Sequence, residues 1–394
     1  MFMNCSSLNE IRIAYTGNFS GQDVPTDAFA NWVNNVSSTG TFYYDGEDTT
    51  TGVNAIPTGW EVKKYSVPDG LRFTARDGGE TVRLFKNGSA PSCSFQYSTD
   101  GEQTWNDLTL GRTFTLANAG DTISFRAKNA QSTLAYNWDR NHKFQLGSTG
   151  HLSVDGSFYA LLRQDWNTAP KSGWMGTKSL RALFSDVTGE FDITNVQPLD
   201  WAPTIDCYGG MFYFANINGA VPSGLLPSTT LAQDCYQAMF QGASITNAPD
   251  LPATTSTASG VYKYMFQDTS NLSTAGCIGM VNVTGSNACE RMFKVSNVVS
   301  VQMNDLVTAS GTNVMTGIFE GCPNLTTINV PKLSYTSGSW NMNAFAIGAS
   351  SLEVVDWSQA TQVPAIQQSA TLMFSSSDYK IVVPDNLYAT WTTA

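Results

Sequence analysis

Basic residues are scarce in this chain, and charge of either sign is low. Of 394 residues only 21 are Lys or Arg against 32 Asp or Glu, so 13% are charged and the net charge is -11. Nucleic acids and anionic membrane surfaces are bound through clustered cations, so the composition argues against both as partners. It also argues against disorder, because 42% of the residues are hydrophobic and 12% are aromatic.

Long hydrophobic runs are missing as well. No stretch approaches the roughly 18 apolar residues that a membrane-spanning helix needs. The first residues, MFMNCSS, lack the basic and apolar parts of a secretory leader. We therefore expect no membrane insertion, and either no secretion through such a leader or a natural chain that begins upstream.

Metal and cofactor signatures are absent. The seven cysteines contain no C-x-x-C pair, which argues against zinc and redox sites. Cys207 and Cys235 are 28 residues apart, and we interpret them as buried core residues, with a disulfide between them as the alternative. The acidic turns at residues 45–48 and 100–102 have oxygen ligands of the kind calcium prefers, but ordinary turn chemistry accounts for both. We predict no metal and no cofactor.

Catalytic motifs are also lacking. The two histidines, His142 and His151, have no neighbouring motif that would activate a serine or cysteine nucleophile. Neither G-x-S-x-G, nor H-E-x-x-H, nor a phosphate-binding glycine loop occurs. A carboxylate pair for glycan hydrolysis leaves no sequence pattern, so an enzyme that degrades surface polysaccharide stays an alternative. The prediction is a protein that is not an enzyme.

What the chain does contain is a repeat, found throughout its second half. A two-residue signature, usually Met-Phe, recurs eight times, and the intervals between the second residues are 28, 28, 26, 27, 26, 26 and 29. Another apolar residue follows five to seven positions later, as at Leu272 and Leu325. The pairs are Leu183-Phe184, Met211-Phe212, Met239-Phe240, Met265-Phe266, Met292-Phe293, Ile318-Phe319, Ala344-Phe345 and Met373-Phe374.

One such repeat cannot bury its own apolar residues, so successive repeats must stack and share a core. The Met-Phe segment, often preceded by Tyr, has the pattern of a short helix or turn, and the residues after it have that of a short strand. These patterns predict a mixed α/β solenoid, a leucine-rich-repeat array of about eight units with a period of 26–29 residues. The second choice is a parallel β-helix, whose coils are commonly shorter and lack a recurrent aromatic helical position.

Three phrases within these repeats resemble a known family. They are CYQAMF at residues 235–240, APDLPATT at 248–255 and IFEGCPNL at 318–325. They are similar to BspA-like leucine-rich repeats of bacterial surface proteins and of phages of gut bacteria, and IVVPDNLYATW at 381–391 resembles the end of such arrays. The resemblance covers roughly residues 158–394 and implies a repeat solenoid in a surface or virion protein.

A small antiparallel β-sandwich is predicted before the repeats, over residues 66–152. Apolar and polar residues alternate in six segments with turn sequences between them. The segment from Phe95 to Trp105 also resembles the β-domain that often precedes BspA-like repeats, which implies that Trp105 fills the core between the sheets. The six expected strands are residues 71–74, 81–85, 94–98, 113–116, 122–126 and 142–146.

Residues 1–65 have the pattern of a partial repeat and a cap. Phe2, Cys5 and Leu8 have the spacing of Phe319, Cys322 and Leu325. An unpaired repeat edge tends to associate with another chain, so we expect this edge to dock on an assembly partner or on another copy in a homo-oligomer; missing upstream coding sequence is the alternative. The expected docking residues are Phe2, Leu8, Ile11 and Ile13.

The expected organisation is therefore a partial repeat with its cap (1–65), a β-sandwich (66–152) and a repeat solenoid with a C-terminal cap (153–394). Trp340, Trp357 and Trp391 are the candidate binding or interface residues, since exposed aromatic rings stack on sugars or fill interfaces. The predicted function is a virion protein of the phage tail or head fibre type, which binds a host-surface glycan or protein. A secreted bacterial cell-surface adhesin is the first alternative and a polysaccharide-degrading enzyme the second.

Overall fold

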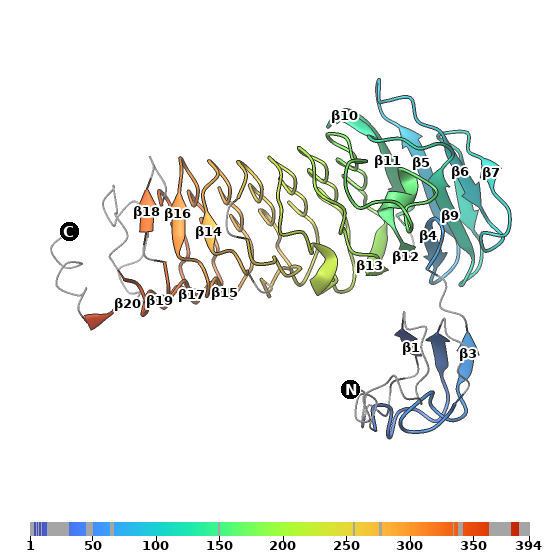
Figure 1. Ribbon diagram of the computed structural model, residues 1–394, viewed down its shortest axis with the longest axis horizontal. Coiled ribbons are helices and arrows are strands. Elements are labelled where there is room, and N and C mark those ends of the chain that lie inside the picture. The colour runs from blue at the N-terminus through green and yellow to red at the C-terminus, as the bar shows by residue number, and fades with distance from the viewer. Residues whose placement is uncertain are drawn as a thin grey trace. The chain divides into compact units, whose positions relative to one another are not determined.

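The protein forms two compact units, Met1–Val67 and Pro68–Ala394, in the computed structural model (Figure 1). The structure describes residues 4, 6, 8, 10–13, 31–44, 50–63, 67–148, 150–254, 257–275, 278–333, 335–337, 342–361 and 380–385.

The first unit contains a three-stranded parallel sheet, β1 (Glu10–Ile13), β2 (Thr41–Tyr44) and β3 (Glu61–Lys63), in that order. Ile11 is paired with Phe42, and Phe42 with Val62. Two indole N–H groups tie the turns together: Trp32 donates to the carbonyl of Ala55 at 3.0 Å and Trp60 to that of Ser37 at 2.8 Å. The small core consists of Ile11, Trp32, Val33, Phe42, Tyr44, Ala55, Ile56 and Trp60.

The second unit begins with the predicted sandwich, and a strand occurs in each of the six expected segments. Phe144 in one sheet packs against Phe73 and Phe125 in the other, with ring centroids 4.8 and 5.4 Å apart. One sheet, in the order β10-β11-β5-β8, consists of Ala135–Asn137, Arg140–Leu146, Glu80–Lys86 and Thr113–Leu116. The other, in the order β13-β12-β4-β9-β6-β7, consists of Glu190–Val196, His151–Gly156, Leu71–Ala75, Thr122–Ala127, Phe95–Ser98 and Asn106–Asp107.

Trp105 does not fill the core between these sheets. It is only half-buried, and the guanidinium of Arg126 covers its ring at 4.0 Å. The core is filled by phenylalanines of the alternating strands instead, so the implied role of Trp105 is wrong.

Strand β12 joins the sandwich to the coils. It pairs antiparallel with β4 on one side and parallel with β13 on the other. The sheet therefore passes from the sandwich into the first coil without a break, and one hydrophobic core runs through both. The expected boundary between residues 152 and 153 falls inside β12.

The repeats stack as successive coils, side by side in Figure 1. In the later coils β14 (Asn282–Val283), β16 (Thr308–Ser310) and β18 (Tyr335–Ser337) form one parallel sheet. A second parallel sheet consists of β15 (Ser300–Gln302), β17 (Thr327–Asn329), β19 (Val354–Asp356) and β20 (Lys380–Val382). Earlier coils are joined by isolated parallel bridges such as Asn247 to Thr274.

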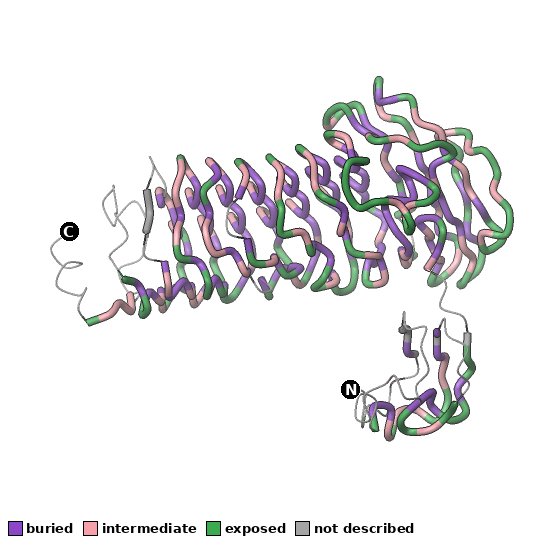
Figure 2. Tube along the Cα trace, viewed as in Figure 1, coloured by how far each residue is buried: buried purple, intermediate pink, exposed green. Residues whose placement is uncertain are grey.

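A column of phenylalanine rings runs through the coils. Neighbouring rings from Phe184 to Phe319 are stacked, with centroids 5.2 to 5.8 Å apart and planes within 24°. The last described pair, Phe319 and Phe345, meets edge to face at 88°. Each contact adds roughly 0.5–1.5 kcal/mol beyond simple burial. Figure 2 shows buried residues along the inside of the stack. The described positions of the Met-Phe pairs are buried, which confirms them as core, except for Ala344, which is half-buried.

The Met-Phe segments are turns rather than helices, and this overturns the prediction of a mixed α/β solenoid. Within residues 234–242, Ala238 donates its backbone N–H to Lys263 of the next coil, whereas Gln237 donates to Asp234 three residues back. The same alternation occurs in the neighbouring coils, and we call these segments, residues 178–186, 206–214, 234–242, 260–268, 287–295 and 313–321, the turn ladder. An α-helix needs bonds to the fourth residue back, and these N–H groups are directed elsewhere.

A left-handed residue recurs at every fourth position of the turn ladder. In one coil these are Gly260, Tyr264 and Asp268, with φ near +60°, and in the next Asn287, Arg291 and Val295. Each such residue interrupts the run of right-handed φ values that a helix requires. In the part of the chain that the structure describes, 3% of the residues are helical and 26% are in strands, and the helical residues include the short 3-10 helices η1 (Phe158–Leu161) and η2 (Ser223–Leu225).

Cys207 and Cys235 occupy equivalent places in successive coils, both as free, fully buried thiols. Burial raises the pKa of Cys235 to about 12, so the protonated thiol is the stable form. Core packing is confirmed and the alternative of a disulfide is wrong. Within the described residues, no helix has the length and apolar character needed to cross a bilayer.

The turn ladder predicts an unusual response to glycine. Val295 is 48% exposed and has φ of 57°, a conformation that costs an L-residue about 1–2 kcal/mol. Replacing it with glycine removes that strain but adds about 0.5–1 kcal/mol of backbone entropy. Val295→Gly should therefore leave the free energy of unfolding unchanged or raise it by up to about 1.5 kcal/mol.

The matched control is Val299→Gly, at a residue 44% exposed that has no positive φ, and it should lower the free energy of unfolding by about 0.5–1 kcal/mol. Urea unfolding of the three proteins measures the difference. Equal destabilisation by both substitutions would show that residue 295 lies in an ordinary helical conformation.

Candidate functional site

The tryptophans expected to bind a partner divide into one buried residue and two outside the described part of the chain. Trp357 is fully buried, and its backbone N–H donates to Val382 in β20. The structure therefore places its ring in the core, where it has no exposed face for a sugar. Trp340 and Trp391 lie outside the described residues.

The expected docking residues lie in the first unit. Leu8 is half-buried against its core and Ile11 is buried in it, while Phe2 lies outside the described residues. The backbone of Ile13 ends β1, but its side chain is not described. Among the described strands β1 has β2 as its one partner and so forms an edge of this sheet; the docking prediction itself stays a prediction.

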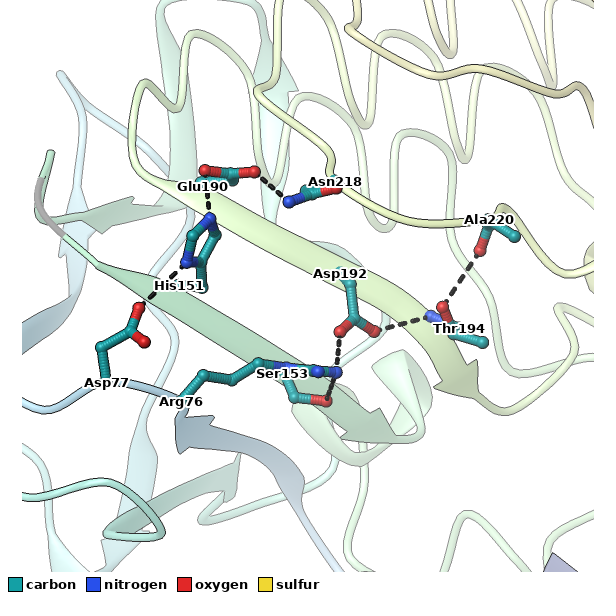
Figure 3. Close-up of polar contacts among 9 residues, drawn as sticks. All are labelled: Arg76, Asp77, His151, Ser153, Glu190, Asp192, Thr194, Asn218 and Ala220. Carbon is teal, nitrogen blue, oxygen red and sulfur yellow. Dashed lines mark hydrogen bonds and ion pairs between the residues drawn. The ribbon is translucent and has the colours of Figure 1, made fainter. Parts of the chain in front are cut away.

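The densest polar cluster lies across strands β4, β12 and β13, at the junction of sandwich and coils (Figure 3). Inward residues such as Leu152 and Phe191 are buried, and alternation along a strand turns their neighbours to the opposite face. His151 of β12 is paired in register with Glu190 of β13, and Ser153 with Asp192.

His151 is held between two carboxylates. Its Nδ1 lies 2.9 Å from Oδ2 of Asp77 and its Nε2 lies 2.5 Å from Oε2 of Glu190. The Asn218 side-chain amide donates to the other oxygen of Glu190. The hydrogen bond to Asp77 is the largest influence on His151, and with the charges of both carboxylates it raises the pKa of the imidazole above 6.5. The protonated imidazole, which donates from both nitrogens, is therefore favoured.

A second ion pair completes the cluster. The Arg76 guanidinium pairs with Asp192, whose side chain is 12% exposed and whose other oxygen accepts the backbone N–H of Thr194 at 3.1 Å. Gly219, with φ of +98°, lies against these residues, and a Cβ there would come 3.2 Å from Cβ of Asp192. Arg76, His151, Asp192 and Asn218 line an open cavity of about 370 Å³.

The geometry of this cluster is better suited to linking β12, β13 and the end of β4 than to acid–base catalysis. Asp77 and Glu190 each bind His151, and Asp192 binds Arg76. General acid–base catalysis requires a group that can exchange its proton with a substrate, and here each of the three carboxylates already accepts from the protein. Within the described residues, no group of three or more His, Cys, Asp or Glu side chains is arranged so that it could hold a metal ion.

The other expected polar residues have local structural roles. His142 is fully buried, and its Nδ1 lies 3.1 Å from the Leu134 carbonyl, so this nitrogen is the N–H donor. Desolvation lowers the pKa of His142, so its ring is neutral in the core. In the turn at 100–102 the Asp100 carboxylate accepts from Ser98 and Thr104, which lowers its pKa to about 2. Residues 45–48 lie outside the described part.

Sequence reasoning did not find the cluster because its members come from four distant segments. Arg76, His151, Glu190 and Asn218 form no local motif, and only the pairing of β12 with both β4 and β13 brings them together. The one usable signal was the rarity of histidine.

The His151 cluster predicts a specific pH dependence. Because the folded pKa is raised, the stabilisation from His151 is complete below its ordinary pKa of 6.5 and is lost as the pH rises through the folded value. The loss of stability caused by His151→Asn should therefore be larger at pH 6 than at pH 9, as measured by urea unfolding. NMR of the two imidazoles should show His151 titrating above 6.5 and His142 below it. Two coincident titrations near 6.5 would contradict this account.

No protein-family model, curated protein or solved structure matches the chain. The resemblance to BspA-like repeats therefore stays an expectation that rests on the sequence motifs alone.

Proposed function

We propose that this chain is a structural and recognition protein of a virion, of the phage tail or head fibre type, and that it is not an enzyme. The observation that supports this best is the regular stacking of the coils. Backbone hydrogen bonds of 2.8–3.1 Å join each turn-ladder segment from 206–214 to 260–268 to the next one, and the phenylalanine column fills the interior behind them.

Such stacking holds the outward side chains at fixed places. Equivalent residues of successive coils are separated by the spacing of paired strands, about 4.8 Å. A partner can then make many weak contacts along one face without ordering flexible loops, so the entropic cost of binding is low. Some ionic side chains of successive coils pair with each other, as Lys263 binds Glu290 at 2.8 Å and Lys294 binds Glu320 at 2.7 Å.

The arrangement of carboxylates supports a role without catalysis. A glycosidase uses one carboxyl group as a proton donor and a second as nucleophile or base. Beside His151, Glu190 is bound by His151 and Asn218, and Asp192 by Arg76. Neither is free to take up these two roles.

The first test asks where the chain is found. Particles purified from a culture that produces this chain should contain it, as detected by mass spectrometry and by antibody labelling in electron microscopy. The particle-free supernatant and the washed cells are the controls. Absence from the particles together with presence on the cell surface would overturn the virion proposal in favour of the adhesin. Polysaccharide hydrolysis that is lost in Glu190→Gln would overturn the non-enzymatic role.

A second test concerns the docking of the first unit. We propose that the β1 edge binds another virion protein or a second copy, because a strand edge offers unpaired N–H and C=O groups. Removing residues 1–67, which form a separate compact unit, should abolish incorporation into particles while residues 68–394 keep their circular dichroism spectrum. The control is Val62→Ser, an exposed residue of β3 at the opposite edge of the sheet. Normal incorporation of the truncated chain would contradict the docking role.

A further inference from the structure

A second open cavity, of about 490 Å³, differs in chemistry from the one beside His151. It lies where the two-residue turn between β10 and β11, Trp138 and Asp139, meets the turn ladder of the first coils. Its volume falls within the range of ligand pockets. Beyond that turn, the lining residues that matter here are Tyr213, Gln237, Gln241 and Tyr264.

Trp138 is held in place from three sides. The guanidinium of Arg181 lies 4.4 Å from its ring centre and the Tyr213 ring meets it edge to face at 5.1 Å. Gly210 lies directly against the ring, and any Cβ there would overlap its atoms. Arg181 is itself buried and paired with Asp206. The indole is thus fixed before any ligand arrives, which reduces the entropic cost of binding.

Some polar groups in this cavity are bonded within the protein, as the Gln241 amide is to Asp268 and the Tyr264 hydroxyl to Glu290, but others are free. Within the described residues, the Trp138 indole N–H, the Asp139 carboxylate and the Gln237 amide have no hydrogen-bond partner in the protein. The Tyr213 hydroxyl also has none. Free hydrogen-bond donors and acceptors therefore face one cavity together with the aromatic rings of Trp138, Tyr213 and Tyr264.

This combination matches one class of ligand. A pyranose ring has an apolar C–H face that packs on aromatic rings, and its hydroxyls exchange hydrogen bonds with amide, carboxylate and indole groups. The charges around the cavity also distinguish neutral sugars from anionic ones. Asp139 and Asp186 are exposed at the cavity. Three cations lie beside its lining residues, and each is already paired with a carboxylate: Lys143 with Asp186, Arg181 with Asp206 and Lys263 with Glu290. Anionic sugars would be repelled.

We propose that the cavity beside Trp138 binds a pyranose unit of a neutral glycan, with Trp138 and Tyr213 packing on the ring and Gln237 and Asp139 bonding its hydroxyls. The proposal rests on the recognition function proposed above and supplies its ligand class and site.

Isothermal titration calorimetry with neutral hexasaccharides tests it: maltohexaose, cellohexaose, mannohexaose and chitohexaose, with hexagalacturonate as the anionic probe. At least one neutral probe should bind and hexagalacturonate should not. Trp138→Ala and Gln237→Ala should each weaken binding at least tenfold. The matched control is Trp174→Ala, an exposed tryptophan that also stacks on an arginine, Arg163 at 3.8 Å, but lies outside this cavity.

If Trp138→Ala unfolds, the affinity of Gln237→Ala tests the site instead. Gln237 is half-buried on the surface of the coil, so its replacement should leave the chain folded. Binding of no neutral probe, stronger binding of hexagalacturonate, or unchanged affinity in Gln237→Ala overturns the glycan site. These outcomes remain separate from the proposed function. A chain that is present in particles but binds no neutral probe loses the site and keeps the function, whereas a chain that binds a probe through Trp138 but is absent from particles keeps the site and loses the virion role.

Discussion

The direction in which the turn ladder donates its backbone N–H groups determines most of this structure. Every second N–H is given to a carbonyl of the next coil, so no coil satisfies its own backbone. Buried N–H groups without a partner are costly, and each coil is therefore stable only beside its neighbours. The phenylalanine column and the two parallel sheets follow from this arrangement, since hydrogen bonding in register brings equivalent residues of successive coils face to face.

The two polar cavities are consequences of where the coils begin. At the junction, β12 is shared between an antiparallel and a parallel neighbour, and side chains from the sandwich and the first coils meet in two places. In one place they pair with each other around His151 and reinforce the junction. In the other, several groups around Trp138 have no partner in the protein and face solvent, and these are the groups that the proposed sugar would contact.

The sequence allowed the buried positions to be predicted but not the backbone that places them. Alternation located six of the ten strands in the two sheets of the sandwich, and the period of the Met-Phe pairs located the core of the coils, because burial depends on side-chain polarity. The helical interpretation missed the left-handed residue at every fourth position of the turn ladder. Many of these positions are Gly, Asn or Asp, as at Gly260 and Asn287, but others, such as Tyr264, Val295 and Phe214, give no signal of that conformation. Neither cavity could be predicted, because Trp138 and His151 gain their neighbours only through long-range pairing, and Trp357 was expected at the surface although it fills the core.

Because β12 belongs to both the sandwich and the first coil, the two ends of the coil stack differ. One end is closed by the sandwich, so that the open edge of the first coil is covered and cannot recruit another strand. Coils gained or lost at the far end during evolution would change the reach of the stack without disturbing Trp138, Gly210 or Arg181. The number of coils and the chemistry of the cavity beside Trp138 can therefore vary independently.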